Sequence, residues 1–416
     1  MNIKRWYKWV STWYIVYALL GIVSLGLVPI LLPLAVSSKG AGNVGIIMAG
    51  FYLGGISASI AGYLCDKYRL HKTIIMGGLF LLGISLGIFR FSHSLIWMLF
   101  LSILMGIGIS GVSTVANLLI VEKYPETEWD DRIGWLQSFY GIGQVMGLVL
   151  VILFTKDILA GFFVSSMLAI MGIMVSFFTI HTPDEPISSI KQVKIKEIKH
   201  GEWSVSGPNK AHHSINIRVL KSMKNMFKTE FGIFMIAWLL VYTGAAGVFS
   251  LYPVLYKTFY HVPPGLSSAA FAAAVATGLF LYAPSGMLSN RMGAKKVFGF
   301  SIGIRIIAFL FMAILPFIPS LNPGIPSLLL FGIIVLAWSP LSVSSLAYTA
   351  SISTIGEGEA MGIYNTVSNL AGVIGSLAGG LLASFFGYGA VPLLAAVLLS
   401  VGLLVLSAAK KAAIVK

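Results

Sequence analysis

Twelve long stretches of mainly apolar residues recur along the chain, and they constrain its fold more than any other feature. About 20 apolar residues in a row suffice for a helix to cross a lipid bilayer. The chain of 416 residues is 57% hydrophobic and only 10% charged, whereas a soluble domain carries about 25% charged residues. The sequence therefore predicts an all-α membrane protein, and it argues against a soluble enzyme, a nucleic-acid binder and a disordered scaffold. The predicted spans are residues 12–36, 43–64, 73–90, 95–120, 132–155, 160–180, 231–256, 267–288, 297–317, 326–349, 359–384 and 389–408.

Lysine and arginine are distributed unevenly between the two sides of these spans. An even number of crossings places both chain ends on one side, and 23 of the 28 basic residues fall on that side. Four lie on the other side, and the remaining one, Arg305, lies inside a span. Basic residues are retained on the cytoplasmic side of a membrane. We therefore expect a multi-pass plasma-membrane protein with both termini in the cytoplasm.

One long polar segment divides the chain into two halves. It opens with Pro183 and Pro186, which stop a helix, and it ends before the seventh span. Between residues 214 and 228, apolar and basic residues alternate with helical spacing, which is typical of an amphipathic helix on a membrane surface. The predicted units are residues 1–182, a cytoplasmic tether at 183–229, and residues 230–416. A regulatory or docking role for the tether is the alternative to simple anchoring.

The two halves repeat each other. Gly62-Tyr-Leu-Cys-Asp66-Lys67 follows the second span, and Gly286-Met-Leu-Ser-Asn290-Arg291 follows the eighth, 224 residues later. Pro29 and Pro253 are separated by the same offset, and Gln137 and Asn365 pair at 228. Since each half has an even number of spans, the copies have the same orientation and are related by an axis along the membrane normal. The sequence predicts two pseudo-symmetric six-helix bundles.

At these residues the chain resembles the major facilitator superfamily of secondary transporters. The family signature after the second helix reads Gly-x-x-x-Asp-(Arg/Lys)-x-Gly-x-(Arg/Lys)-(Arg/Lys), with a degenerate copy after the eighth. Arg69 and His71 depart from the first copy, and Asn290 replaces the acid of the second. The resemblance implies the major facilitator fold and says little about the substrate.

The resemblance also implies that the signature loops form a cytoplasmic gate. In the family these loops hold the cytoplasmic side closed, and Asp66 is suited to accept hydrogen bonds from the start of the eleventh span. Topological retention by basic residues alone is the alternative. The predicted gate residues are Gly62, Asp66, Lys67, Lys72, Gly286, Asn290, Arg291 and Lys296.

Polar side chains inside the spans point to a substrate cavity. The resemblance implies that helices 1, 4, 7 and 10 line a central cavity, with helices 2, 5, 8 and 11 at its sides. Amide side chains carry donors and acceptors that one helix cannot satisfy, so they either tie helices together or face a wet cavity. The predicted cavity residues are Tyr17, Asn117, Gln137, Gln144, Tyr242, Trp338, Asn365 and Asn369.

Ionisable groups are almost absent from the interior of the spans. No Asp or Glu lies deep in a span, and Ser102 stands where the family places an arginine in the fourth helix, so the usual proton-coupling residues are missing. Arg305 lies about 13 Å inside the ninth span. It is either an anion-binding group or a supporting arginine that snorkels or bonds to neighbouring carbonyls.

The sequence thus predicts a secondary transporter, not an enzyme, that works by alternating access. The uncharged cavity favours a small neutral or amphipathic organic solute, sugar-like or drug-like. The expected partners are this solute and the lipid bilayer, with no cofactor, no nucleic acid and an unknown coupling ion. A lipid scramblase or flippase on the same scaffold and a non-transporting membrane receptor are the alternatives.

Overall fold

The computed structural model describes residues 9–125, 128–180, 229–318, 322–353 and 357–414. Residues 183–228 of the predicted tether, with its amphipathic helix, lie outside the described residues. Within the described ranges the protein is helical, and twelve segments are long and apolar enough to cross a membrane. This confirms the predicted all-α fold with twelve spans.

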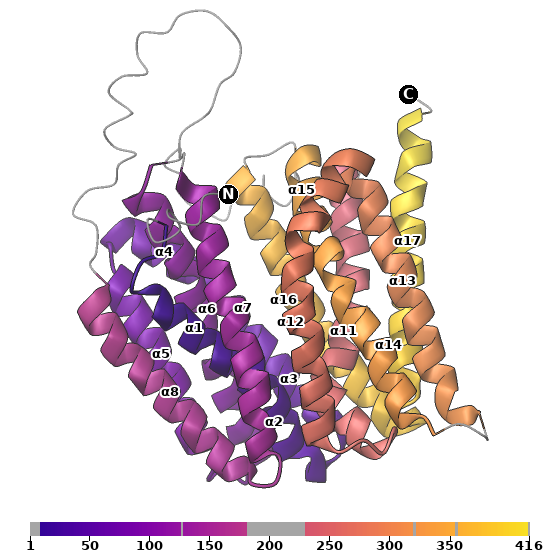
Figure 1. Ribbon diagram of the computed structural model, residues 1–416, viewed down its shortest axis with the longest axis horizontal. Coiled ribbons are helices and arrows are strands. Elements are labelled where there is room, and N and C mark those ends of the chain that lie inside the picture. Colours follow the sequence, from indigo (N-terminus) through magenta and orange to yellow (C-terminus); the bar gives the residue numbers. More distant parts are fainter. Residues whose placement is uncertain (1–8, 126–127, 181–228, 319–321, 354–356, 415–416) are drawn as a thin grey trace, which may run out of the picture.

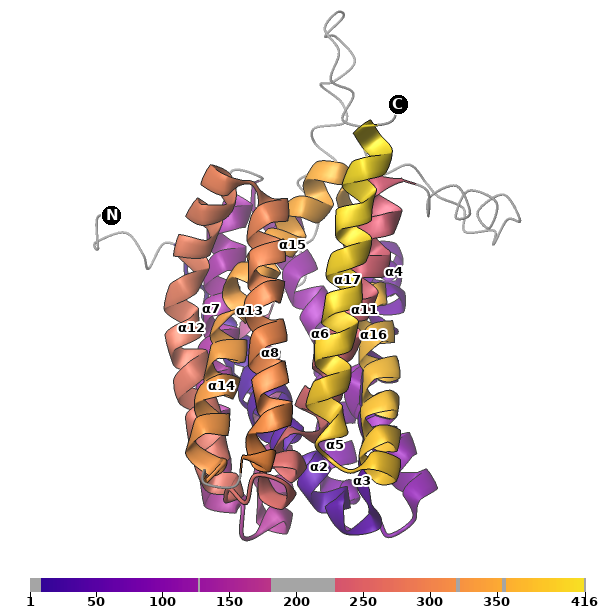
Figure 2. The same ribbon diagram turned by 90° about the vertical axis from the view of Figure 1, so that its right-hand side faces the viewer.

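The first six spans form one bundle, drawn from indigo to magenta in Figure 1, and the last six form a second, drawn from salmon to yellow. The N-terminal bundle contains α1 (Tyr14–Gly21), α2 (Val28–Val36), α3 (Ala41–Gly55), α4 (Ala58–Tyr68), α5 (His71–Phe89), α6 (Leu95–Lys123), α7 (Trp129–Phe154) and α8 (Ile158–Thr179). The C-terminal bundle, which faces the viewer in Figure 2, contains α11 (Glu230–Thr258), α12 (Pro264–Met292), α13 (Ala294–Ile314), α14 (Gly324–Leu336), α15 (Trp338–Ile352), α16 (Glu357–Phe386) and α17 (Ala390–Ile414).

The outer surface of both bundles is apolar. Phe178, Phe280 and Phe385 are 73%, 81% and 78% exposed. Water would make such a surface aggregate, whereas lipid tails solvate it. The outward-facing side chains therefore fit a protein that is surrounded by a bilayer.

Three spans are interrupted near their middle. The first changes into a π-helical turn at Ile22–Leu27, the second breaks between α3 and α4, and the tenth breaks between α14 and α15 at Ala337. Pro340 contributes to the last break because it has no N–H to offer to the carbonyl four residues earlier. Interrupted helices are typical of the binding region of transporters, since they free backbone groups at the membrane midplane.

Glycines let corresponding helix pairs approach closely in the two bundles. A Cβ on Gly147 of α7 would lie 2.2 Å from the carbonyl oxygen of Ile22 in the first span. A Cβ on Gly375 of α16 would likewise lie 2.2 Å from the carbonyl oxygen of Thr243 in α11. Gly147 and Gly375 are 228 residues apart, which is the offset that pairs Gln137 with Asn365. Both bundles thus pack their first helix on their fifth in the same way.

Among the described residues, the two bundles pack against each other mainly along one half of their length. We call the side where α8 ends, α11 begins and α17 ends the terminal side, and the opposite side the far side (Figure 1). On the far half α3 packs against α16, where the backbone N–H of Gly42 donates to Ser384 Oγ at 2.7 Å. The second seam joins α7 to α12, where Leu279 lies against Gly141.

Gly134 of α7 and Gly286 of α12 belong to the terminal halves of the same helices, and a Cβ there would meet nothing within 4 Å. The bundles therefore separate toward the terminal side.

Candidate substrate cavity and gate

Three predicted cavity residues meet in the N-terminal bundle. Gln137 Nε2 of α7 donates to Asn117 Oδ1 of α6 at 3.3 Å, and Asn117 Nδ2 donates to the carbonyl oxygen of Ser113 at 2.8 Å. The hydroxyl of Tyr17 in α1 lies beside the side chains of Gln137, Asn117 and Ser113. Gln137 is exposed although it belongs to a membrane span. The first, fourth and fifth spans thus present one polar cluster with unused hydrogen-bonding capacity.

Aromatic rings form the matching surface of the C-terminal bundle. Trp238 of α11 stacks on Tyr364 of α16, with ring centroids 4.9 Å apart and planes at 19°. Its Nε1 donates to Ser368 Oγ at 2.8 Å. The predicted residues Tyr242 and Trp338 lie 6.0 Å apart, and Trp338 lies 6.4 Å from Trp238. Trp238 and Tyr364 are buried, whereas the half-buried rings of Tyr242 and Trp338 can stack on an aromatic or otherwise planar solute.

Trp238 was not among the predicted cavity residues. Its signal in the sequence was the internal repeat, because the residue 224 positions earlier is Tyr14, another aromatic residue of a first helix. The N-terminal bundle has a comparable stack, in which Tyr17 lies 4.6 Å from Tyr140 of α7.

The remaining predicted amides lie in different surroundings. Asn369 Nδ2 donates to the carbonyl oxygens of Gly55 in α3 at 3.4 Å and Asn365 at 3.1 Å, so it belongs to the seam between the bundles. Asn365 is exposed and Gln144 is half-buried. A cavity role for these three amides stays a prediction.

Tyr52 of α3 reaches the C-terminal bundle, and the sequence did not single it out. A Cβ on Gly372 of α16 would lie 2.4 Å from its ring. Its hydroxyl lies close to Ser250 and Tyr242 of α11. Tyr52 therefore crosses from one bundle to the other.

A groove on α7 continues the seam toward the terminal side. It has a volume of about 280 Å³ and is lined by Asp131, Gly134, Trp135 and Ser138. Gly134 and Ser138 follow the helical spacing that leads to Gly141, the residue that touches α12 farther along. The face of α7 that contacts the other bundle on the far half is thus open on the terminal half.

The signature loops lie on the terminal side. Lys67 Nζ lies 5.5 Å and 5.0 Å from the ring centroids of Tyr63 and Tyr68. These phenols, Tyr68 foremost, hold the pKa of the Lys67 ammonium above its usual value. Lys72 Nζ of α5 donates to the carbonyl oxygen of Phe177 in α8 at 2.7 Å, so it ties two helices of one bundle.

The other predicted gate side chains, glycines aside, are exposed or lie outside the described residues. Asn290, Arg291 and Lys296 are exposed, and the side chain of Asp66 lies outside the described residues. Among the side chains that the structure describes, no predicted gate residue bonds to the opposite bundle. The gating role therefore stays a prediction.

Arg69, where the signature has its second glycine, ends α4 in a left-handed conformation with φ 57°. Its N–H donates to the carbonyl oxygen of Cys65 at 2.7 Å. Gly293 occupies the matching place after α12 with φ 87°. The glycine of the signature is thus explained by the positive φ at this position, where a side chain is disfavoured.

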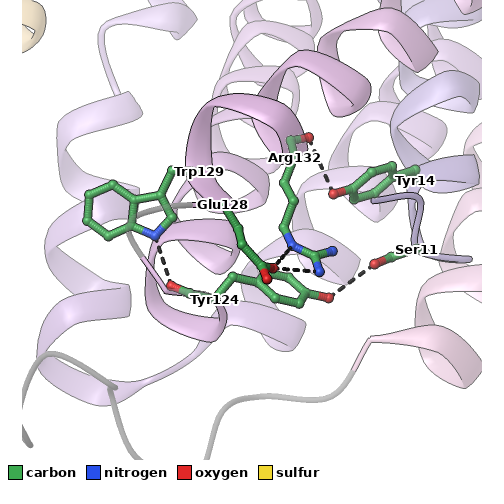
Figure 3. Close-up of polar contacts among 6 residues, drawn as sticks. All are labelled: Ser11, Tyr14, Tyr124, Glu128, Trp129 and Arg132. Atoms are coloured by element: carbon green, nitrogen blue, oxygen red, sulfur yellow. Dashed lines mark hydrogen bonds and ion pairs between the residues drawn. The ribbon is translucent and has the colours of Figure 1, made fainter. Parts of the chain in front are cut away.

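A cluster on the terminal side, which the sequence did not reveal, fixes three spans of the N-terminal bundle (Figure 3). The guanidinium carbon of Arg132 lies 3.5 Å from the ring centroid of Tyr124, and Arg132 Nε donates to Glu128 Oε2 at 2.8 Å. The Tyr124 and Ser11 hydroxyls are 3.1 Å apart, and the Tyr14 hydroxyl donates to the Arg132 carbonyl oxygen at 3.3 Å.

The C-terminal bundle has a related contact, in which Tyr348 lies 224 residues after Tyr124 whereas the acid and the base come from other positions of the repeat. The Tyr348 hydroxyl donates to Glu230 Oε1, and Lys295 Nζ lies 3.3 Å from the same oxygen. On the terminal side each bundle is therefore held together by a tyrosine, an acid and a base.

Twelve helices in two bundles, with a polar and aromatic region between them and an opening on one side, define a secondary transporter. The Major Facilitator Superfamily model matches residues 13–351 and, a second time, residues 234–413. The chain belongs to this family and is a non-enzymatic membrane transporter.

Similar proteins agree with this assignment. The chain is 25% identical over 384 residues to an uncharacterized MFS-type transporter, MJ1560, from Methanocaldococcus jannaschii, covering 88% of this chain and 89% of that protein. A variant of the nucleoside transporter NupG superposes with a TM-score of 0.75 at 15% identity, over 95% of this chain and 99% of that one. A bacterial homologue of the human lysosomal transporter Spinster, solved inward-facing and occupied, gives 0.72 at 15% identity, over 99% and 98%. At these identities the likeness of the solved structures shows the fold alone.

Proposed function

We propose that this transporter moves a small neutral or amphipathic organic solute across the plasma membrane, and that the terminal side is the cytoplasmic side. The observation that carries the proposal is the pairing of Gln137 and Asn117 with Tyr17, opposite an aromatic surface around Trp238. Amides bind hydroxyl, carbonyl and amine groups without demanding a charge, and aromatic rings bind flat apolar ones.

The charge distribution supports the orientation. The basic residues concentrate on the side where the bundles separate, and basic loops stay in the cytoplasm. With that orientation the described conformation is open to the cytoplasm and closed outside. Residues 1–182 and 230–416 then act as two rigid units, with 183–229 as the tether between them.

Flux into proteoliposomes tests the proposal. The purified protein is reconstituted, and uptake of a solute panel of sugars, nucleosides and planar drug-like compounds is measured with and without imposed proton and sodium gradients. At least one solute should enter faster than in empty liposomes. A gradient that accelerates the flux identifies the coupling ion.

Variants connect that flux to the proposed site. Gln137→Ala and Asn117→Ala should each raise the KM. The free-energy change calculated from the KM of the double variant should be smaller than the sum of the two single changes, because the two amides share one hydrogen bond. Asn43→Ala removes an amide on the far side, which donates to the carbonyl oxygen of Lys39, and should leave the flux unchanged. Undiminished flux in both cavity variants would contradict the site, and flux of a fluorescent phospholipid alone would favour a scramblase.

A further inference from the structure

Arg305 is the most unusual side chain in the protein. It lies on α13, 11 residues after Ala294, which corresponds to a depth of about 16 Å. Its side chain is 0% exposed, and Nε, Nη1 and Nη2 have no hydrogen-bond partner. The expectation that this arginine snorkels to the membrane surface or bonds to neighbouring carbonyls is therefore wrong.

The guanidinium points away from lipid, toward helices that border the candidate cavity. Its carbon lies 6.0 Å from the ring centroid of Phe249 in α11 and 5.6 Å from that of Trp338 in α15. Tyr242, seven residues before Phe249 on the same face of α11, is close enough to interact electrostatically with Arg305. Tyr242, Phe249 and Trp338 are each half-buried, so one layer of aromatic rings separates the cation from accessible space.

Nothing described in the protein neutralises this charge. Glu230, an acid of the same bundle, is occupied by Tyr348 and Lys295, and no described carboxylate pairs with Arg305. The fold does not require a cation here either, because the residue 224 positions earlier in the repeat is Leu81. A buried charge without a partner is costly, so its retention is explained by a partner that is present part of the time.

We propose that Arg305 is the anion-binding subsite of this transporter, and that its ligand is the carboxylate of an amphipathic, aromatic solute. This rests on the proposed function and narrows the solute to an acid whose flat part stacks on the half-buried rings of Trp338 and Tyr242. The planar guanidinium offers two parallel N–H donors to a carboxylate. Because Trp338 directly follows the helix break at Ala337, a shift at this break uncovers Arg305.

Thermal unfolding of the purified protein tests the proposal without requiring transport. The probes are benzoate, 2-naphthoate and indole-3-acetate, each paired with its neutral amide. In the wild type at least one acid should raise the Tm while its amide does not. In Arg305→Met that acid should bind about 10- to 100-fold more weakly, as expected for the loss of a charge-assisted hydrogen-bond pair.

Matched variants separate this role from a structural one. Arg305→Met without ligand should unfold at the wild-type temperature or above, since an unpaired buried charge is removed. Arg305→Lys should keep the preference for the acid and bind it more weakly. Arg90→Met is the control, because Arg90 also lies over two rings, those of Phe91 and Phe163, on the far side and should bind the acid like the wild type.

The results of these measurements either support or overturn the proposed Arg305 subsite. No acid that stabilises the wild type, or an acid preference that survives in Arg305→Met, would overturn the proposal. If Arg305→Met does not fold, loss of the acid preference in Arg305→Gln with retained binding in Arg305→Lys supports it, and equal binding in both overturns it. Acids that bind through Arg305 without being carried into proteoliposomes would refute the proposed transport and leave this subsite standing. Transport of neutral solutes without any binding of acids would support the proposed transport and refute the Arg305 subsite.

Discussion

Gly45→Ala should shift the protein away from the described conformation. Gly45 lies on α3 in the far-side seam, where a Cβ would stand 2.4 Å from the carbonyl oxygen of Ser376 and 2.9 Å from Cα of Gly380. Both atoms belong to the backbone of α16 in the other bundle, so they cannot move aside as a flexible side chain would. The clash exists only while the far side is closed.

The size of the shift follows from this geometry. Overpacking a tight contact costs about 1–3 kcal/mol. Applied to only one of two conformations, this changes their ratio by about 5- to 150-fold. The gain in helix propensity from glycine to alanine is common to both conformations and cancels.

Distances between two spin labels, measured by pulsed electron paramagnetic resonance, report the ratio of the two conformations. With Cys65, the only cysteine, replaced by alanine, spin labels are attached at Tyr68→Cys and Met292→Cys on the terminal side, both exposed positions on opposite bundles. Gly45→Ala should enlarge the population with a short terminal-side distance. Labels at Phe91→Cys and Phe317→Cys on the far side should move in the opposite direction.

Two alanine controls isolate the seam. Gly77→Ala adds a methyl where nothing lies within 4 Å, on an exposed position of α5 away from both seams, and should leave both distances unchanged. Gly54→Ala meets the carbonyl oxygen of Ile103 at 2.2 Å inside the N-terminal bundle, so it should lower the Tm without altering the ratio. Unchanged distance distributions in Gly45→Ala would refute the reasoning.

The remaining predictions concern stability. Gly293→Ala should lower the free energy of unfolding by about 1 kcal/mol in detergent, because a side chain is disfavoured at its φ of 87°. Equal unfolding midpoints of this variant and the wild type would contradict this. Tyr124→Phe keeps the ring under Arg132, loses the contact with Ser11, and should cost about 1 kcal/mol, whereas Tyr124→Ala should cost about 2 kcal/mol more. Both are measured by chemical unfolding, and equal losses would show that the stacked ring contributes nothing.

The spans could be predicted from the sequence because the bilayer demands them. A helix such as α6 must bury an apolar stretch of fixed length, and hydropathy reports that length directly. The repeat added the two-bundle arrangement, since matched residues such as Pro29 and Pro253 indicate matched surroundings.

The direction of each side chain could not be predicted in the same way. In a soluble helix, polar residues mark the outer face, but here lipid and bundle interior are both apolar, so the sequence carries little rotational signal. Tyr52 therefore passed unnoticed although it crosses between the bundles, and the sequence did not reveal that Asn369 bonds to Gly55 in the seam. Arg305 was placed at the right depth, but only the structure shows that it points inward.

A disulfide across the far-side seam tests alternating access most directly. An ideal Cβ on Gly42 lies 3.9 Å from Cβ of Ser384, which suits a disulfide bond. In protein lacking Cys65, the pair Gly42→Cys and Ser384→Cys should form this bond on oxidation and lock the far side shut. The account predicts that solute flux in proteoliposomes stops on oxidation and returns on reduction, while either single variant transports throughout. Undiminished flux through the fully cross-linked protein would contradict it.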